Sequence, residues 1–378
     1  MSASHHLRLA LRLAQRGRGT VSPNPMVGAV LVKGRRIIGQ GWHRRAGGPH
    51  AEIEALQDAR RNGFDPRGAT LFVTLEPCSS HGRTPPCTDA IAAAGIRRVV
   101  IGTRDPNPKH AGRAWRLLRR RGIRVESADA TLARDCAGLN EVFNHWIVRR
   151  TPHVTVKSAM TLDGKIATAS GESRWITGPA ARAAGMRLRR GMDAILVGVN
   201  TILADDPSLT FRGRGRRAAP LRRIVLDSMA RTPLAARVVS DEHAADTTIV
   251  VSHRAPRRRV QALAGRVKVL VSPAPRIASA ASGRGIDLRW LLRRLGRDDV
   301  TSLLVEGGGE VNASFLLQRL AQRVVFFYAP KVLGGRDARK AVAGEGAATL
   351  AEALQLRDVR WRRLGQDWQM TAAPAPAV

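Results

Sequence analysis

Three side chains in the amino-terminal half could bind a metal ion together. His50 lies at the expected start of a helix, Cys78 follows a buried strand, and Cys87 opens another expected helix. Zinc accepts cysteine thiolates and histidine nitrogens readily, and three protein ligands leave its fourth tetrahedral position open to water. Helix amino termini also favour a thiolate, because the helix dipole is positive there. The pattern therefore predicts a zinc site with an open position.

Glu52 lies two residues after His50, in the first turn of the same helix, and is not expected to bind the metal. Zinc lowers the pKa of its bound water to about 7, so a neighbouring carboxylate can take the water's proton and deliver it to a leaving amine. His-x-Glu followed by Pro-Cys and a second cysteine is the pattern of zinc deaminases. We therefore predict a deaminase with Glu52 as its catalytic residue. Cys136 has no ligand-type neighbour, and we interpret it as a core residue.

Strands and helices alternate around these residues. Strands are expected over 27–33, 36–41, 69–76 and 98–102, and helices after Pro49 and over 88–94. This alternation predicts a sheet with helices on its faces. No acidic residue precedes Glu52, so the arginine-rich start resembles a transit peptide. The apolar spacing of Leu7, Ala10 and Ala14 favours instead the first helix of a domain.

Length and composition limit the possible classes of protein. A chain of 378 residues predicts two or three domains at roughly 150 residues each. Hydrophobic residues make up 44% and charged residues 25%, which excludes a largely disordered chain. No apolar run is long enough for a transmembrane helix, so no membrane partner is expected. Three cysteines are too few for a disulfide framework, which indicates a reducing, cytoplasmic location.

The net charge of +33 comes from 63 lysines and arginines against 30 acids, and nearly all the cations are arginines. Such charge suits a nucleic-acid protein, and it also suits an ordinary enzyme whose solvated positions are biased to arginine. Aromatic residues are only 4%, which is few for the stacking platforms that bind single strands. We expect no nucleic-acid partner. A basic protein attracts phosphorylated small molecules in either case.

A domain boundary is predicted near 148–152, where Pro152 would end any preceding helix, and divides the chain into 1–148 and 149–378. In the second part, strands are expected over 194–199, 222–226, 247–251 and 302–305. A glycine run, Gly307–Gly309, then precedes an apolar helix over 311–320. It could bind a phosphate or form a tight turn, and it lacks the full dinucleotide fingerprint. Residues 340–378 carry no motif, and 372–378 are expected to be a frayed tail.

Several motifs resemble those of the bifunctional riboflavin-biosynthesis deaminase–reductase family. In the first half these are Pro23-Asn24-Pro25-x-Val27-Gly28, Gly48-Pro49-His50-Ala51-Glu52, Glu76-Pro77-Cys78 through Pro86-Cys87, and Asp105-Pro106-Asn107-Pro108. In the second half they are Lys157–Gly164, Gly171–Thr177, Thr201–Arg212 and Glu306-Gly307-Gly308. The step of nine residues from Cys78 to Cys87 differs from the Pro-Cys-x-x-Cys of nucleic-acid deaminases. The resemblance implies an α/β protein, with a cytidine-deaminase-like three-layer domain followed by a dihydrofolate-reductase-like α/β domain.

The resemblance also implies roles for particular residues. In the deaminase domain Asn24, His43 and Arg83 would contact the substrate, together with either His81 or Ser80, because the family usually has histidine where this chain has Ser80. NADPH would lie along Ala159, Trp175, Thr201, Asp205, Ser228, Gly308, Gly309, Glu310, Val311, Asn312, Ala313 and Ser314. The substrate of the reductase domain would meet Lys157, Ser173, Arg189, Leu209, Arg212 and Glu306.

The function implied is deamination of 2,5-diamino-6-ribosylamino-4(3H)-pyrimidinone 5′-phosphate, followed by reduction of its ribosyl group to ribityl. The first step would use one Zn²⁺ per chain and the second NADPH, with Glu306 or Asp205 assisting proton movement. The family likeness further suggests a homo-oligomer. One alternative is a nucleic-acid base deaminase with a basic accessory domain. Another is a non-catalytic binding protein, which would require loss of His50, Glu52, Cys78 or Cys87, and all four are present.

Overall fold

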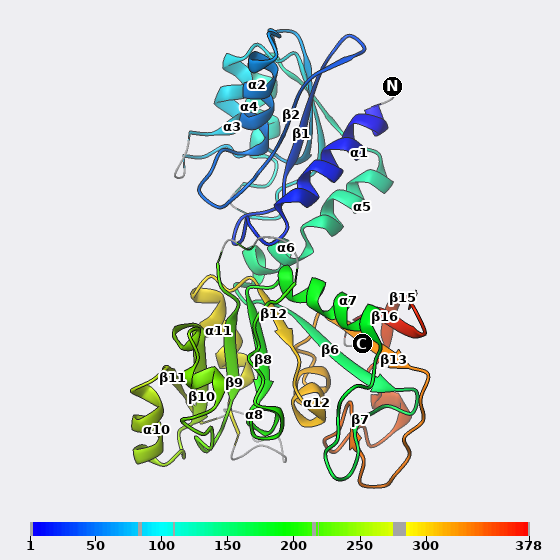
Figure 1. Ribbon diagram of the computed structural model, residues 1–378. Coiled ribbons are helices and arrows are strands. Elements are labelled where there is room, and N and C mark those ends of the chain that lie inside the picture. Colours follow the sequence, from blue (N-terminus) through cyan, green and yellow to red (C-terminus); the bar gives the residue numbers. More distant parts are fainter. Residues whose placement is uncertain are drawn as a thin grey trace. The chain divides into compact units, whose positions relative to one another are not determined.

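The computed structural model describes residues 3–81, 85–108, 110–213, 217, 219–274 and 285–376. The chain forms two compact units that divide after Arg150 (Figure 1). Each unit is built on its own sheet. Across the described ranges, no helix is both long enough and apolar enough to cross a membrane.

The sheet of the first unit has five strands in the order β2-β1-β3-β4-β5. These strands are β1 (Gly28–Lys33), β2 (Arg36–Trp42), β3 (Thr70–Leu75), β4 (Arg98–Thr103) and β5 (Arg124–Ser127). β1 runs antiparallel to both of its neighbours, whereas β3, β4 and β5 are parallel to one another. The carboxyl ends of the parallel strands therefore meet at one edge, where the chain turns into helices.

Helices cover both faces of this sheet because apolar side chains alternate along its strands. Leu31, Leu71 and Ile101 pack under α2 (Ala51–Arg61), α3 (Cys87–Ala93) and α4 (Arg113–Arg120). Val30, Phe72 and Val100 face α1 (Ala3–Ala14) and α5 (Ala130–Leu139), and Cys136 is buried among them. The unit ends in α6 (Glu141–Arg149). It is thus the predicted three-layer domain, and the arginine-rich start is a helix packed on the sheet.

Two glycines of β2 let α2 approach the sheet closely. A Cβ atom on Gly39 would lie 2.3 Å from the carbonyl oxygen of Ala55, and one on Gly41 would lie 2.4 Å from that of Ala51. Any side chain at these positions would push the helix away. The glycines therefore hold the first turn of α2, which carries the predicted catalytic residues, against the sheet.

The second unit contains a sheet of nine strands in the order β11-β10-β9-β8-β12-β6-β13-β16-β15. These are β6 (His153–Thr161), β8 (Ala194–Gly198), β9 (Arg222–Leu226), β10 (Thr247–Ser252), β11 (Lys268–Ser272), β12 (Ser302–Val305), β13 (Arg323–Ala329), β15 (Leu356–Leu364) and β16 (Asp367–Pro374). The pairs from β11 to β13 are parallel, and β16 and β15 continue the sheet antiparallel. A small sheet pairs β7 (Lys165–Ala167) with β14 (Arg339–Lys340).

The helices of this unit are α7 (Pro179–Arg190), α8 (Val199–Asp205), α9 (Arg237–Ser240), α10 (Arg257–Ala264), α11 (Leu288–Arg297) and α12 (Gly309–Leu317). From β8 the chain proceeds outward through β9, β10 and β11, and then returns to place β12 on the other side of β8. Parallel sheets bind ligands beyond the carboxyl ends of their strands at such a reversal of order. The ends of β8 and β12, at Gly198 and Glu306, are therefore the expected ligand-binding edge.

Two expectations differ from the structure. The helix expected over 311–320 is α12, which begins at Gly309 and ends at Leu317. The expectation of a frayed tail from Ala372 is wrong for Ala372–Pro374, which belong to β16. Ala372 pairs with Val324 of β13 and is buried. A distant partner strand supplies the burial that orders this segment, and local composition gives no sign of it.

Candidate active sites

The three predicted metal ligands converge in the first unit. His50 is the N-cap of α2, Cys78 follows β3, and Cys87 is the first residue of α3. The Nδ1 atom of His50 lies 3.2 Å from the Sγ of Cys87 and 3.4 Å from the Sγ of Cys78. The three ligand atoms all lie within 4.8 Å of one another. Among the residues with described positions, this is the one such group of histidine, cysteine or acidic side chains.

These separations fit a tetrahedral zinc ion. With Zn–S bonds of about 2.3 Å and Zn–N bonds of about 2.0 Å, nitrogen and sulfur ligands stand about 3.5 Å apart. The interaction between the two thiols lowers the pKa of Cys78 and raises that of Cys87. The backbone N–H of Cys87 donates to the Sγ of Cys78 at 3.2 Å, which further stabilises a thiolate there. The donor set and its geometry therefore suit Zn²⁺.

Glu52 is buried beside this cluster, in the first turn of α2, with only 3% of its surface exposed. Burial raises the pKa of its carboxyl to about 7. The carboxyl also interacts with the thiol of Cys87, which places it against the metal ligands. A group with such a pKa can both accept and release a proton near neutral pH.

A second histidine adjoins the metal ligands. His43 is buried, and its ring contacts that of His50 edge to face with centroids 5.4 Å apart. Burial lowers the pKa of His43, so its neutral Nδ1–H donates to the carbonyl oxygen of Pro49 at 2.9 Å. Its Nε2 can then accept from the side-chain amide of Asn24 at 3.1 Å. The structure thus joins the predicted substrate residues Asn24 and His43 to the zinc cluster.

The loop between Cys78 and Cys87 carries the other predicted substrate residues of this unit. His81 is exposed, Ser80 is partly buried, and Arg83 lies outside the described residues. The roles of His81, Ser80 and Arg83 stay predictions.

Glu76 begins the Glu-Pro-Cys motif, but the sequence assigned it no role of its own. It is buried two residues before Cys78, and its carboxylate accepts backbone N–H bonds from Asp105 at 3.2 Å, Gly112 at 3.0 Å and Ala114 at 3.0 Å. It therefore ties the end of β3 to the loop after β4 and to the start of α4. The sequence does carry a signal for this role. A carboxylate between a buried strand and Pro-Cys is expected to be buried, and a buried carboxylate needs hydrogen-bond donors.

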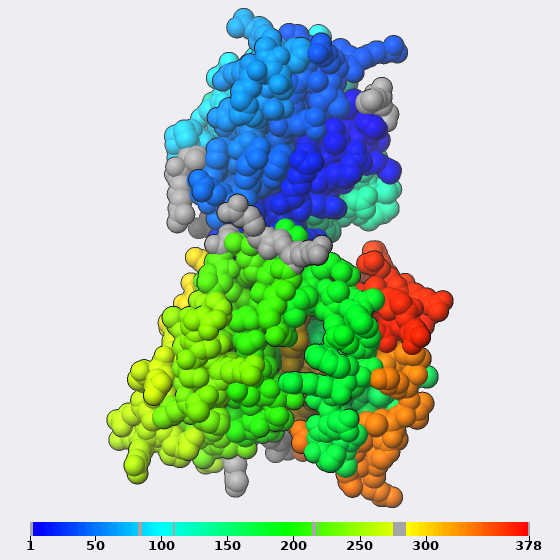
Figure 2. Space-filling view, in the orientation of Figure 1, coloured from blue at the N-terminus to red at the C-terminus, as the bar shows by residue number. Residues whose placement is uncertain are grey.

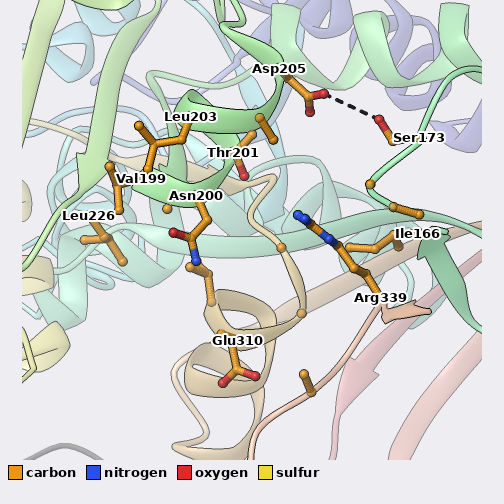
Figure 3. Close-up of a pocket in the computed structure, with 18 of the residues that line it drawn as sticks. Ile166, Ser173, Val199, Asn200, Thr201, Leu203, Asp205, Leu226, Glu310 and Arg339 are labelled. Atoms are coloured by element: carbon orange, nitrogen blue, oxygen red, sulfur yellow. Dashed lines mark hydrogen bonds between the residues drawn. The ribbon is translucent and has the colours of Figure 1, made fainter. Parts of the chain in front are cut away.

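Most of the predicted reductase residues line one of three cavities in the second unit. The largest, about 770 Å³, opens at the ends of β8 and β12 between α8 and α12 and is visible as a hollow in the surface (Figures 2 and 3). A second, of about 330 Å³, shares Ile166, Ser173 and Asp205 with it. A third, of about 390 Å³, extends from the second along Pro207–Leu209. Asp205 lines all three and so stands at their junction.

The predicted substrate residues gather in the two smaller cavities. The second cavity is lined by Lys157, Ser173, Arg189, Arg212 and Glu306. Leu209 lines the third, which Arg189 and Arg212 also reach. Other residues of these walls were not predicted as site residues, and they include Arg174, Ile176, Thr177, Arg182 and Arg237. Arg174 and Arg182 could not be recognised from the sequence, because arginines are frequent along the whole chain.

A buried ion cluster forms the floor of the second cavity. Arg189 donates two parallel hydrogen bonds of 2.9 Å to the carboxylate of Glu306, and the Nζ of Lys157 lies 3.6 Å from it. Burial by itself would raise the pKa of Glu306, but the charges of Lys157 and Arg189 outweigh it and hold that pKa at about 2. Glu306 is therefore an anion at neutral pH and cannot donate a proton.

The predicted cofactor residues divide between the cavities. The largest is lined by Thr201, Asp205, Ser228, Gly308, Gly309, Glu310 and Val311. Ala159 and Trp175 line the second cavity instead. Asn312, Ala313 and Ser314 line none of the three: Asn312 is buried and donates to the carbonyl oxygen of Ala341, Ala313 is buried, and the Ser314 hydroxyl donates to that of Glu310.

The largest cavity fits a dinucleotide. Gly308 is the N-cap of α12, and its Cα faces open space, so backbone N–H groups can approach a phosphate there. A Cβ on Gly309 would lie 2.3 Å from the carbonyl oxygen of Lys340, so only glycine allows the close approach of that segment. The cations Arg231, Arg339 and Lys340 add positive charge. None of these three was predicted, because they reach the cavity from segments without a motif.

Comparisons with known proteins agree with this division into two sites. Residues 1–103 match the cytidine and deoxycytidylate deaminase zinc-binding region, and residues 152–370 match the RibD C-terminal domain. The "Riboflavin biosynthesis protein RibD" of Actinobacillus pleuropneumoniae is 41% identical over 97% of this chain and 94% of its own. That of Aquifex aeolicus is 40% identical over 96% of each chain.

A solved structure from Thermotoga maritima is described as a diaminohydroxyphosphoribosylaminopyrimidine deaminase/5-amino-6-(5-phosphoribosylamino)uracil reductase. It is 34% identical, covers 99% of both chains and superposes with a TM-score of 0.80. The RibD structure of Acinetobacter baumannii, at 33% identity and the same coverage, gives a TM-score of 0.85. These similarities extend across both units of the chain.

Proposed function

Because this chain belongs to the RibD family of riboflavin biosynthesis proteins, we propose that each unit catalyses one of two consecutive reactions. The first unit removes the ring 2-amino group of 2,5-diamino-6-ribosylamino-4(3H)-pyrimidinone 5′-phosphate. The second reduces the ribosyl group of the deaminated product to a ribityl chain. The observation that carries the proposal is the coexistence of a three-ligand zinc cluster with a buried acid in one unit and a dinucleotide-sized cavity beside a substrate cavity in the other.

In the deaminase unit the chain's own groups position the substrate and move the proton. His50, Cys78 and Cys87 would hold Zn²⁺, which would supply an activated water for attack on the ring carbon. Glu52 accepts the water's proton and returns it to the departing nitrogen as the carbon–nitrogen bond breaks, so that ammonia leaves. The neutral His43 holds the amide of Asn24 in place, which orients it toward the pyrimidine.

In the reductase unit NADPH supplies the hydride when it is bound in the largest cavity. The shared lining of Ile166, Ser173 and Asp205 brings that cavity to the substrate cavity, as hydride transfer requires contact. Arg189 is neutralised by Glu306, whereas Arg212 lines both smaller cavities and is suited to the ribosyl phosphate. Of the two acids predicted to assist proton movement, Asp205 is the one that lines both the cofactor cavity and the substrate cavities.

Product analysis tests the proposal directly. The purified chain, loaded with zinc, is incubated with the diaminopyrimidine ribosyl phosphate and NADPH, and products are followed by mass spectrometry. We expect a product that has exchanged an amino group for oxygen and has gained two hydrogens, with the deaminated species appearing first. Deamination without reduction would contradict the role of the second unit. An unchanged substrate would contradict both roles and favour the nucleic-acid deaminase, whose binding of RNA or DNA should weaken steeply with salt.

Two predictions about the whole protein belong with this proposal. We propose a cytoplasmic location, which is supported by three cysteines that form no disulfide bond. The expected homo-oligomer can be checked by light scattering of the purified chain.

A further inference from the structure

We infer that Arg231 binds the 2′-phosphate of NADPH and so makes the reductase prefer NADPH to NADH. The inference rests on the proposed function of the second unit, because it assigns one end of the cofactor in that cavity. NADPH and NADH differ only by this phosphate, which lies on the adenosine ribose, far from the nicotinamide. A residue that distinguishes them must therefore reach the end of the cavity that is remote from the substrate.

The two ends of the cavity can be told apart. The nicotinamide must lie where the cavity meets the substrate cavity, at Ile166, Ser173 and Asp205. In Figure 3 these three side chains lie on one side, and Asn200 and Leu226 lie on the other. Leu226 ends β9, which is separated from β6 by β8 and β12. Three inter-strand steps place β9 about 14 Å from β6. β6 leads into β7, whose Ile166 lines both the cofactor cavity and the substrate cavity.

Arg231 belongs to the remote end. It lines the cavity, and its Nη2 donates to the Oδ1 of Asn200 at 2.9 Å. The other two cations of the cavity, Arg339 and Lys340, form β14 and pair with Ala167 and Lys165 of β7. They therefore lie toward the nicotinamide end. Of the three cations in the described lining, Arg231 is thus the one carried by the turn that follows β9, on the side where the adenosine ribose must lie.

The turn that carries Arg231 is fixed before any ligand binds. Both the backbone N–H and the hydroxyl of Thr232 donate to the buried carboxylate of Asp227 at 2.7 Å. Ala230 is fully buried in the left-handed region with φ of 55°, and its carbonyl oxygen accepts from the Nε of Arg259 at 2.6 Å. The backbone of this turn is therefore preorganised, and the planar fork of the guanidinium that it carries matches a phosphate.

Titration calorimetry with two fragments tests the inference without turnover. 2′,5′-ADP carries the phosphate in question and 5′-AMP does not. Replacing a charged hydrogen-bond donor to a phosphate weakens binding by about tenfold to a hundredfold. We therefore expect Arg231→Gln to raise the Kd of 2′,5′-ADP by that factor and to change the Kd of 5′-AMP by less than about twofold. Arg293→Gln is the control, because it removes the same charge from an exposed side chain on α11. It should change the Kd of neither fragment.

Steady-state kinetics give the second readout, with the deaminated intermediate as substrate. Arg231→Gln should raise the KM for NADPH and leave that for NADH unchanged, so that the preference for NADPH falls at least about tenfold. Suppose that the wild-type chain reduces the intermediate. The inference is then overturned if Arg231→Gln weakens the binding of 2′,5′-ADP and of 5′-AMP equally, or weakens the binding of neither. If the wild-type chain did not reduce it at all, the proposed function would fail, and the fragment titrations would still decide the role of Arg231.

Discussion

Replacing Glu306 by glutamine should destabilise the second unit because it removes one anion from between two cations. The side chains of Glu306, Arg189 and Lys157 are only 12%, 13% and 19% exposed, so solvent screens the cluster weakly. The pKa of Glu306 falls from 4.5 to about 2, and at about 1.36 kcal/mol per pKa unit this corresponds to about 3 kcal/mol. That figure agrees with the roughly 3–5 kcal/mol lost when one partner of a buried pair is removed.

Thermal unfolding measures the effect. For a unit of this size, about 3 kcal/mol lowers the Tm by about 6–12 °C. The loss depends on pH in a defined direction: a carboxyl with a lowered folded pKa stabilises the protein above pH 4.5, and this contribution disappears as the pH falls toward 2. The difference in Tm between the wild type and Glu306→Gln should therefore be at its full size at pH 7 and should decrease below pH 4.5.

Two controls sharpen the experiment. Glu242→Gln makes the same change at a side chain that is 81% exposed and should shift the Tm very little. Deamination by the same chain should be unaffected by Glu306→Gln, while reduction is lost because Arg189 and Lys157 are released. An unchanged Tm at pH 7, or a gap that does not narrow in acid, would refute the assignment of Glu306 as a paired anion.

Two further predictions follow from the same contacts. Asp241→Ala should cost about 3–5 kcal/mol in urea unfolding, because the fully buried guanidinium of Arg223 keeps no carboxylate partner, whereas Glu242→Ala should cost under about 0.5 kcal/mol. Removal of zinc by a chelator should abolish deamination and leave NADPH-dependent reduction of the deaminated intermediate intact, as a coupled spectrophotometric assay would show; a parallel loss of both activities would contradict two separate sites.

The sequence predicts the zinc cluster well because its ligands lie at ends of local elements. A strand end and two helix starts can be recognised from short patterns, and parallel strands bring such ends to one edge. Gly39 and Gly41 have no side chains, so α2 can approach β2 closely. The sequence pattern alone did not predict this approach.

Other parts depend on contacts between distant segments and leave little local trace. Arg339 enters the cofactor cavity because β14 pairs with β7, and Arg231 because a turn after β9 meets α8. Neither position carries a motif, and the high arginine content hides both. The same holds for Ala372, whose order comes from pairing with β13.

The central claim is that two independent sites on one chain act in sequence, and Glu52→Gln tests it most directly. The variant keeps the shape of the side chain but cannot accept a proton, and general acid–base catalysis contributes about 10²–10⁴-fold to a rate. We predict that it binds one zinc ion per chain, fails to deaminate the diaminopyrimidine, and reduces the separately supplied deaminated intermediate at the wild-type rate. Deamination at the wild-type rate by zinc-loaded Glu52→Gln, or failure to reduce the supplied intermediate, would contradict the account.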